Sequence, residues 1–247
     1  MVGEGEVLAE LLAAVRELAG RSAARSWLVR LASETVSAET LRAAVEAAGL
    51  DPDEGFQGWA AGSGPVDGSG PAAAQERLDR LPGHCAVGEG PDGLLILTQG
   101  IPEQDVTAAL GTVDCLGVGL LRIGPDAARE TLLDARAAAA LAGGRPGLWR
   151  YQDLWPLTAT AAAADRLDPL LAPAVATART FPHLADAVRA FADHGFAVDP
   201  AARQLRLPAD TLARRLDRWQ QLTGADLRTL PGLTASRTAV ELASRGH

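Results

Sequence analysis

The sequence predicts a mixed α/β fold, of the α/β or α+β class, followed by an all-α C-terminal region. Two patterns carry this prediction. Short apolar strands alternate with amphipathic helices between residues 72 and 151, and from His183 onward every apolar stripe has helical spacing. The alternation predicts a sheet covered by helices on one face. The chain has 247 residues, enough for one or two domains at roughly 150 residues each.

Composition places the chain among soluble globular proteins, with 47% hydrophobic and 22% charged residues. The first residues are acidic where a signal peptide would be basic, and no run reaches the roughly 18 apolar residues of a membrane span. The two cysteines, Cys85 and Cys115, have neither metal-binding nor redox spacing. We therefore expect a cytoplasmic protein without a membrane partner.

Charge is distributed unevenly along the chain, whose formal charge is −8 and whose 23 basic residues are all arginines. Residues 1–177 carry 13 arginines and 24 acidic residues, a balance of −11, whereas residues 178–247 carry 10 and 7, a balance of +3. A basic C-terminal piece on an acidic body is expected where only that piece meets a polyanion.

Three helices are expected near the N-terminus. The first covers residues 8–18, whose apolar stripe either contributes to a dimer seam or packs on its own domain. A second helix begins near Trp27. The third opens with Ser37 as its N-cap and ends before Gly49, where a left-handed conformation is favoured.

The middle of the chain alternates between strands and helices after a Gly/Ser/Pro-rich loop at residues 62–71. Helices are expected at 72–81, 104–110, 127–142 and 159–176. Strands are expected at 85–88, 94–98, 115–123 and 148–151, the first two joined by a turn at Gly90–Gly93.

The last seventy residues have the pattern of a helix-turn-helix. A helix at 183–195 precedes a short helix at 199–205, a tight turn and a longer helix with an apolar stripe ending at Trp219. We expect Pro208 in the first turn of the longer helix, where its missing N–H costs nothing. Trp219 lies on the apolar stripe, so we interpret it as a core residue rather than a stacking platform.

Residues 205–227 resemble the C-terminal helix-turn-helix of PucR/CdaR-type transcriptional regulators. The matching residues are Leu205, Thr211, Leu212, Arg215, Leu216, Arg218, Leu222, Thr223, Gly224, Asp226 and Leu227. Residues 115–138 and 148–154 resemble the degenerate GGDEF-like domain that precedes this tail in the family. The resemblance covers roughly residues 25–245 and implies an α/β GGDEF-like domain with an all-α helix-turn-helix C-terminal domain.

The resemblance and the element pattern together predict four segments. These are an N-terminal helical segment at 1–50, a degenerate GGDEF-like domain at 51–158, a helical connector at 159–178 and a helix-turn-helix DNA-binding domain at 179–247.

The candidate DNA-binding residues are Arg206, Asp210, Thr211, Arg214, Arg215 and Arg218. The family's recognition helix opens with His, Arg and Asn, where this chain has Pro208, Ala209 and Asp210, and a further family arginine is Ala213 here. The first residues of that helix meet base edges, but an aspartate only accepts hydrogen bonds and repels phosphate. Asp210 either accepts from a cytosine amino group or complements the helix dipole.

Arg214 and Arg218 are four residues apart and share one helix face, away from the apolar stripe. Two roles are open for this pair. The guanidinium groups either bind backbone phosphates or form a solvated face that Asp210 and Asp217 partly offset.

Sequence features that would support catalysis are absent. The hairpin at 88–93 lies where a diguanylate cyclase carries its Mg²⁺-binding turn, but Glu89 and Asp92 are out of register and the chain has no lysine for phosphates. The histidines are dispersed without metal spacing at positions 84, 183, 194 and 247. We expect no enzyme activity, no metal and no cofactor.

The resemblance implies a non-catalytic transcriptional regulator that binds double-stranded DNA as a homodimer, because two half-sites require two recognition helices. An alternative is an interaction or dimerisation module that kept the fold and lost DNA affinity. The altered helix opening at residues 208–210 and the acidic net charge motivate it. A small-molecule effector of the α/β domain is a further expectation, although no residue pattern identifies one.

Overall fold

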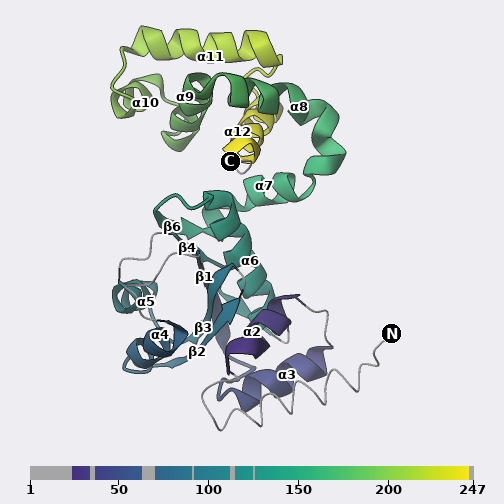
Figure 1. Cartoon of the computed structure of the whole chain (residues 1–247), viewed down its shortest axis with the longest axis vertical. Coiled ribbons are helices and arrows are strands. Elements are labelled where there is room, and N and C mark those ends of the chain that lie inside the picture. Colours follow the sequence, from purple (N-terminus) through teal and green to yellow (C-terminus); the bar gives the residue numbers. More distant parts are fainter. Residues whose placement is uncertain are drawn as a thin grey trace. The chain divides into compact units, whose positions relative to one another are not determined.

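Two units make up the part of the chain that the computed structural model describes, which is residues 24–33, 37–62, 70–90, 92–111, 115–124 and 126–244. The division lies between Leu154 and Trp155. The N-terminal unit is mixed α/β and the C-terminal unit is all-helical (Figure 1). The expected α/β body and helical tail are therefore confirmed. The helix expected at 8–18 and most of the loop expected at 62–71 lie outside the described residues.

A six-stranded sheet organises the N-terminal unit in the order β2-β3-β1-β4-β6, with β5 paired to β1. The strands are β1 (Gly55–Ala61), β2 (His84–Gly90), β3 (Gly93–Gln99), β4 (Cys115–Val118), β5 (Arg122–Ile123) and β6 (Gly147–Arg150). The helices are α2 (Ala24–Ser33), α3 (Ala38–Ala47), α4 (Pro71–Leu78), α5 (Glu103–Leu110) and α6 (Ala127–Ala142). Neighbouring strands are antiparallel except for β4 and β6, which are parallel.

Local signals in the sequence act as expected at several helix ends. The Ser37 hydroxyl accepts a hydrogen bond from the backbone N–H of Thr40 at 3.3 Å, which caps α3. Gly49 follows that helix with a φ of +79°, in the left-handed region. The predicted hairpin forms with Gly90 and Gly93 as its last paired residues.

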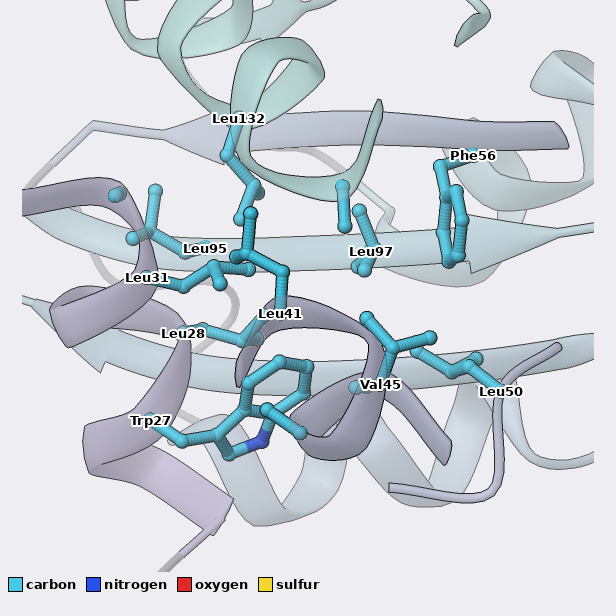
Figure 2. Packing of buried hydrophobic residues seen from close by; sticks show 14 of the residues in the cluster. Trp27, Leu28, Leu31, Leu41, Val45, Leu50, Phe56, Leu95, Leu97 and Leu132 are labelled. Atoms are coloured by element: carbon cyan, nitrogen blue, oxygen red, sulfur yellow. The ribbon is translucent and has the colours of Figure 1, made fainter. Parts of the chain in front are cut away.

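Helices cover both faces of the sheet, so the expectation of one covered face is wrong. On one face α2, α3 and α6 bury a cluster that includes Trp27, Leu41, Leu95 and Leu132, as Figure 2 shows. On the other face α4 and α5 pack over Trp59, and the two helices lie together on that side in Figure 1. Residues 94–99 of β3 are all buried, which requires cover on both faces of the strand.

The single strand expected at 115–123 is wrong, because the structure divides it into β4 and β5. Both parts pair with β1, but the pairs Trp59–Val118 and Phe56–Arg122 differ in register by one residue. This one-residue offset is a β-bulge, which bends the strand and lets its end leave the core. Leu121 and Ile123 are exposed as a result.

Glycines let α6 approach the backbone of β1 and β4 closely. A Cβ atom at Gly58 would lie 2.6 Å from the carbonyl carbon of Thr131, and one at Gly117 would overlap the carbonyl oxygen of Ala135. The Thr131 hydroxyl also accepts a hydrogen bond from the Gly58 N–H at 2.8 Å. The position of α6 against the sheet therefore depends on these two glycines.

The C-terminal unit consists of helices, of which α7 begins before the division of the chain and ends after it. The helices are α7 (Tyr151–Ala162), α8 (Ala164–Thr180), α9 (Pro182–Asp193), α10 (Val198–Gln204), α11 (Ala209–Thr223) and α12 (Leu230–Ser244). Tyr151 was expected to end a strand but begins α7, and helix extends well beyond the expected 159–176 in both directions. Within the described residues, no helix has the length and apolarity that a membrane crossing requires.

Substituting Gly117 tests the close approach of α6. We expect Gly117→Ala to lower the free energy of unfolding by about 3 kcal/mol, because the added methyl group would overlap the α6 backbone. Urea denaturation of the whole chain measures this change. Gly62→Ala is the matched control, since its Cβ would make an ordinary contact of 3.7 Å with Cys115. Equal stabilities of the two variants would contradict the packing described.

Candidate nucleic-acid interface

Helices α10 and α11 form a helix-turn-helix joined by residues 205–208. The turn is closed by the backbone N–H of Leu207, which donates to the carbonyl of Ala202 at 2.9 Å. Arg206 has a φ of +55°, a left-handed conformation that residues other than glycine and asparagine adopt only rarely. Pro208 was expected in the first turn of α11, but it is the extended residue that directly precedes this helix.

The apolar stripe of α11 fixes which of its faces is exposed. Leu212, Leu216 and Trp219 are buried against α9 and the other helices of this unit, and Figure 1 shows α11 lying beside α9 and α10. The Trp219 indole N–H donates to the hydroxyl of Ser236 on α12 at 2.9 Å. The interpretation of Trp219 as a core residue is therefore confirmed.

Four of the candidate DNA-binding residues have exposed side chains. Arg206 lies in the turn, whereas Asp210, Arg214 and Arg218 lie on the face of α11 opposite to the buried stripe. The guanidinium groups of Arg206 and Arg214 make neither an ion pair nor a hydrogen bond with any part of the chain that the structure describes. These two cations are therefore available to an external anion.

The remaining candidates are partly engaged. Arg215 is half-buried, and its Nη1 donates to the carbonyl of His183 at 3.4 Å, which directs this side chain toward the start of α9. Nη1 of Arg218 donates to the side-chain oxygen of Gln221 at 3.2 Å. Thr211 is half-buried in the first turn of α11, where its N–H bonds to the Pro208 carbonyl at 3.0 Å.

Carboxylates do not neutralise the exposed arginines directly. Asp210 precedes Arg214 by four residues and Asp217 follows it by three, yet neither forms an ion pair within the described residues. Both aspartates are exposed, so water and salt screen their attraction to the guanidinium groups. The exposed face of α11 thus carries both signs of charge, and its carboxylates do not hold Arg214 in an ion pair.

Other arginines of this unit are held in ion pairs. Arg237 is buried, and its Nη2 lies 2.8 Å from Asp193 while its Nη1 bonds to the buried Glu241. Arg189 pairs with Asp186 at 3.0 Å. This network ties α9 to α12 and has a structural role. The spacing of four residues between Arg237 and Glu241 is the sequence signal that indicates such a pair.

Arg203 is a further cation that the sequence reasoning missed. It is exposed in the last turn of α10, and its side chain has no ion pair or hydrogen bond among the described residues. Its position three residues before Arg206 is the signal that points to it. In contrast, Arg228 beyond α11 pairs with Asp226 at 3.1 Å, and the backbone N–H and guanidinium of Arg228 lower the pKa of Asp226.

Comparison with known families identifies this C-terminal region. Residues 184–243 match the model of the PucR C-terminal helix-turn-helix domain, which confirms the resemblance of the tail. The solved structures include a regulator of polyketide synthase expression from Bifidobacterium adolescentis, with 18% identity and a TM-score of 0.49. The match covers 90% of this chain and 96% of that one. No curated protein matches the sequence.

Two substitutions at Arg206 separate its backbone conformation from its charge. Arg206→Gly and Arg206→Gln both remove the cation, but only glycine relieves the left-handed conformation. We expect the glycine variant to be more stable than the glutamine variant by about 1 kcal/mol in urea denaturation. The glutamine variant should match the wild type, since the Arg206 side chain has no partner to lose in the part of the chain that the structure describes. A glycine variant no more stable than the glutamine variant would contradict this expectation, since relief of strain would then not exceed the entropic cost of glycine in the unfolded chain.

Proposed function

We propose that this chain is a DNA-binding transcriptional regulator of PucR/CdaR type, with residues 179–247 as its DNA-binding domain. The observation that carries the proposal is that a PucR-type helix-turn-helix keeps Arg206 and Arg214 exposed and without an ion pair among the described residues, while other arginines of the same unit are held in ion pairs. An anionic partner supplies the hydrogen-bond acceptors that these two guanidinium groups do not find among the described residues.

The six sequence candidates divide into three roles in this proposal. Arg206, Arg214 and Arg218 bind backbone phosphates and position the protein, since each guanidinium is exposed and phosphate contacts carry no sequence information. Asp210 and Thr211 lie in the first turn of α11, where residues of a recognition helix meet base edges. Arg215, bonded to the carbonyl of His183, supports α11 from the side of α9.

Two copies of the chain form the DNA-bound species in this proposal. One α11 reads one half-site, and a second copy is needed for the other half-site about one turn of the duplex away. Such a dimer brings the modest charge of +3 on residues 178–247 to the duplex twice. The phosphate contacts of both copies then add to the affinity.

The N-terminal unit has the role of a degenerate, non-catalytic GGDEF-like domain. In support, the β2–β3 hairpin turns at residues 90–93, where a diguanylate cyclase holds its metal. Asp92 in that turn pairs with Arg136 at 3.0 Å, and no lysine exists in the chain to bind a triphosphate. These residues fit a structural or sensory role better than nucleotide chemistry.

A protein-interaction module without DNA affinity is the second candidate. The exposed carboxylate of Asp210 at the opening of α11 favours it, because this charge repels phosphate where the family carries an asparagine. The two candidates differ in salt dependence. A DNA-binding regulator loses affinity steeply as salt rises, whereas an interaction module binds no duplex measurably even at low salt.

Arg214→Ala tests the phosphate contact. We expect it to weaken binding to every duplex sequence by a similar factor and to reduce the slope of log affinity against log salt by about 1. Fluorescence anisotropy of a mixed-sequence duplex, titrated with the whole chain at several salt concentrations, provides both quantities. Arg80→Ala is the control, since Arg80 is also exposed but pairs with Glu76 in the N-terminal unit. If Arg214→Ala and the control bind alike, Arg214 is not part of the interface.

Asp210→Asn tests the effect of the carboxylate. We expect tighter binding to mixed-sequence duplexes and a steeper salt dependence, because one charge that repels phosphate is removed. The anisotropy titration above measures it. Asp199→Asn, in the first turn of α10, is matched for its effect on a helix dipole and should change the affinity less. Weaker binding confined to one preferred sequence would instead assign Asp210 to a base contact.

A further inference from the structure

A cavity of about 530 Å³ lies in the N-terminal unit, on the side of the sheet that α2 and α6 cover. Its walls come from the ends of β1 and β3, from Val29 on α2 and from the C-terminal half of α6. Leu95 belongs both to this wall and to the packed cluster, where Figure 2 shows it beside Leu31 of α2 and Leu132 of α6. This volume is within the range of about 300–1,000 Å³ that small-molecule pockets occupy.

Small side chains in the walls keep the cavity open. Ala60, Ala61 and Gly62 line it at the end of β1, and Ala137 and Ala140 line it from α6. The remaining lining side chains are predominantly apolar, with Leu94, Leu95 and Leu133 the largest of them. A ligand that fills this space must therefore have an apolar body.

Arg136 and Asp92 supply the charged groups of the lining. They form an ion pair at 3.0 Å between Nη2 of Arg136 and Oδ2 of Asp92, with side-chain exposures of 33% and 76%. The Arg136 guanidinium makes this one hydrogen bond among the described residues, although it carries five N–H donors. Its other donors are thus available beside an apolar hollow, and guanidinium groups bind carboxylates through two parallel hydrogen bonds.

We propose that this cavity binds a small organic monocarboxylate, with its apolar body between α6 and the ends of β1 and β3 and its carboxylate on Arg136. The hydrogen bond to Asp92 orients the guanidinium and leaves its other N–H groups for the ligand. An uncharged ligand of the same shape would leave these donors without an anion. The site is contained in the N-terminal unit and does not depend on DNA binding.

Calorimetry of the whole chain, without DNA, tests this assignment. The probes are benzoate, phenylacetate and isovalerate, each compared with its own neutral amide. We expect at least one carboxylate to bind saturably and at least tenfold more tightly than its amide. Equal affinity of the acid and the amide, or no heat from any of the three carboxylates at millimolar concentration, would overturn the proposal.

Variants locate the binding. Arg136→Gln should weaken carboxylate binding at least tenfold, whereas Arg42→Gln should leave it unchanged. Arg42 is a matched control because it forms a similar half-exposed pair with Asp53, with exposures of 41% and 80%, and does not line the cavity. Ala137→Leu should also abolish binding by filling the space. Tight binding that survives both Arg136→Gln and Ala137→Leu would overturn the assignment, and circular dichroism verifies that each variant is folded.

Discussion

The burial of Trp219 is the constraint on which the candidate interface depends. Its side chain is fully buried, and its indole N–H is bonded to Ser236 on α12. A rotation of α11 about its own axis would expose this large apolar surface and break that hydrogen bond. The rotation of α11 is therefore fixed, and the arginines at positions 214 and 218 face outward because the tryptophan faces inward.

The ion pairs of the same unit complete this arrangement. Asp193 and Glu241 engage Arg237, so two of the carboxylates of this unit are consumed between α9 and α12 rather than beside α11. A buried arginine without such partners would be strongly destabilising. Structural arginines and candidate phosphate-binding arginines are thus separated by the positions of the acidic residues. Although residues 178–247 have a net charge of only +3, the exposed face of α11 therefore still carries arginines without carboxylate partners among the described residues.

Elements with strong local signals could be predicted from the sequence. The Ser37 N-cap, the hairpin at Gly90–Gly93, the bounds of α6 and the core position of Trp219 all follow from capping, turn chemistry or helical spacing. The DNA-binding hypothesis required Arg206 and Arg214 to be exposed. Whether they have partners depends on where carboxylates distant in the sequence lie in the fold, and residue spacing does not show this; among the described residues they have none.

Properties that depend on tertiary packing were beyond the sequence. The run at residues 94–97 is apolar at every position, which fits a strand covered on both faces, yet the alternation of elements favoured one covered face. The bulge between Val118 and Arg122 shifts the pairing with β1 by one residue. Because the sequence from 115 to 123 is apolar almost throughout, its pattern does not reveal this shift. The cavity beside Arg136 arises from alanines and glycines of separate elements that meet only in the folded chain.

Selection of bound sequences from a random duplex pool tests whether the exposed arginines of the helix-turn-helix contact DNA. The whole chain and a variant with glutamine at positions 206, 214 and 218 would be compared at moderate salt. We expect the wild-type chain to enrich a motif of two half-sites about one helical turn apart and the variant to enrich none. Failure of the wild-type chain to enrich any sequence, or the same motif recovered with the variant, would contradict the assignment of this surface to DNA.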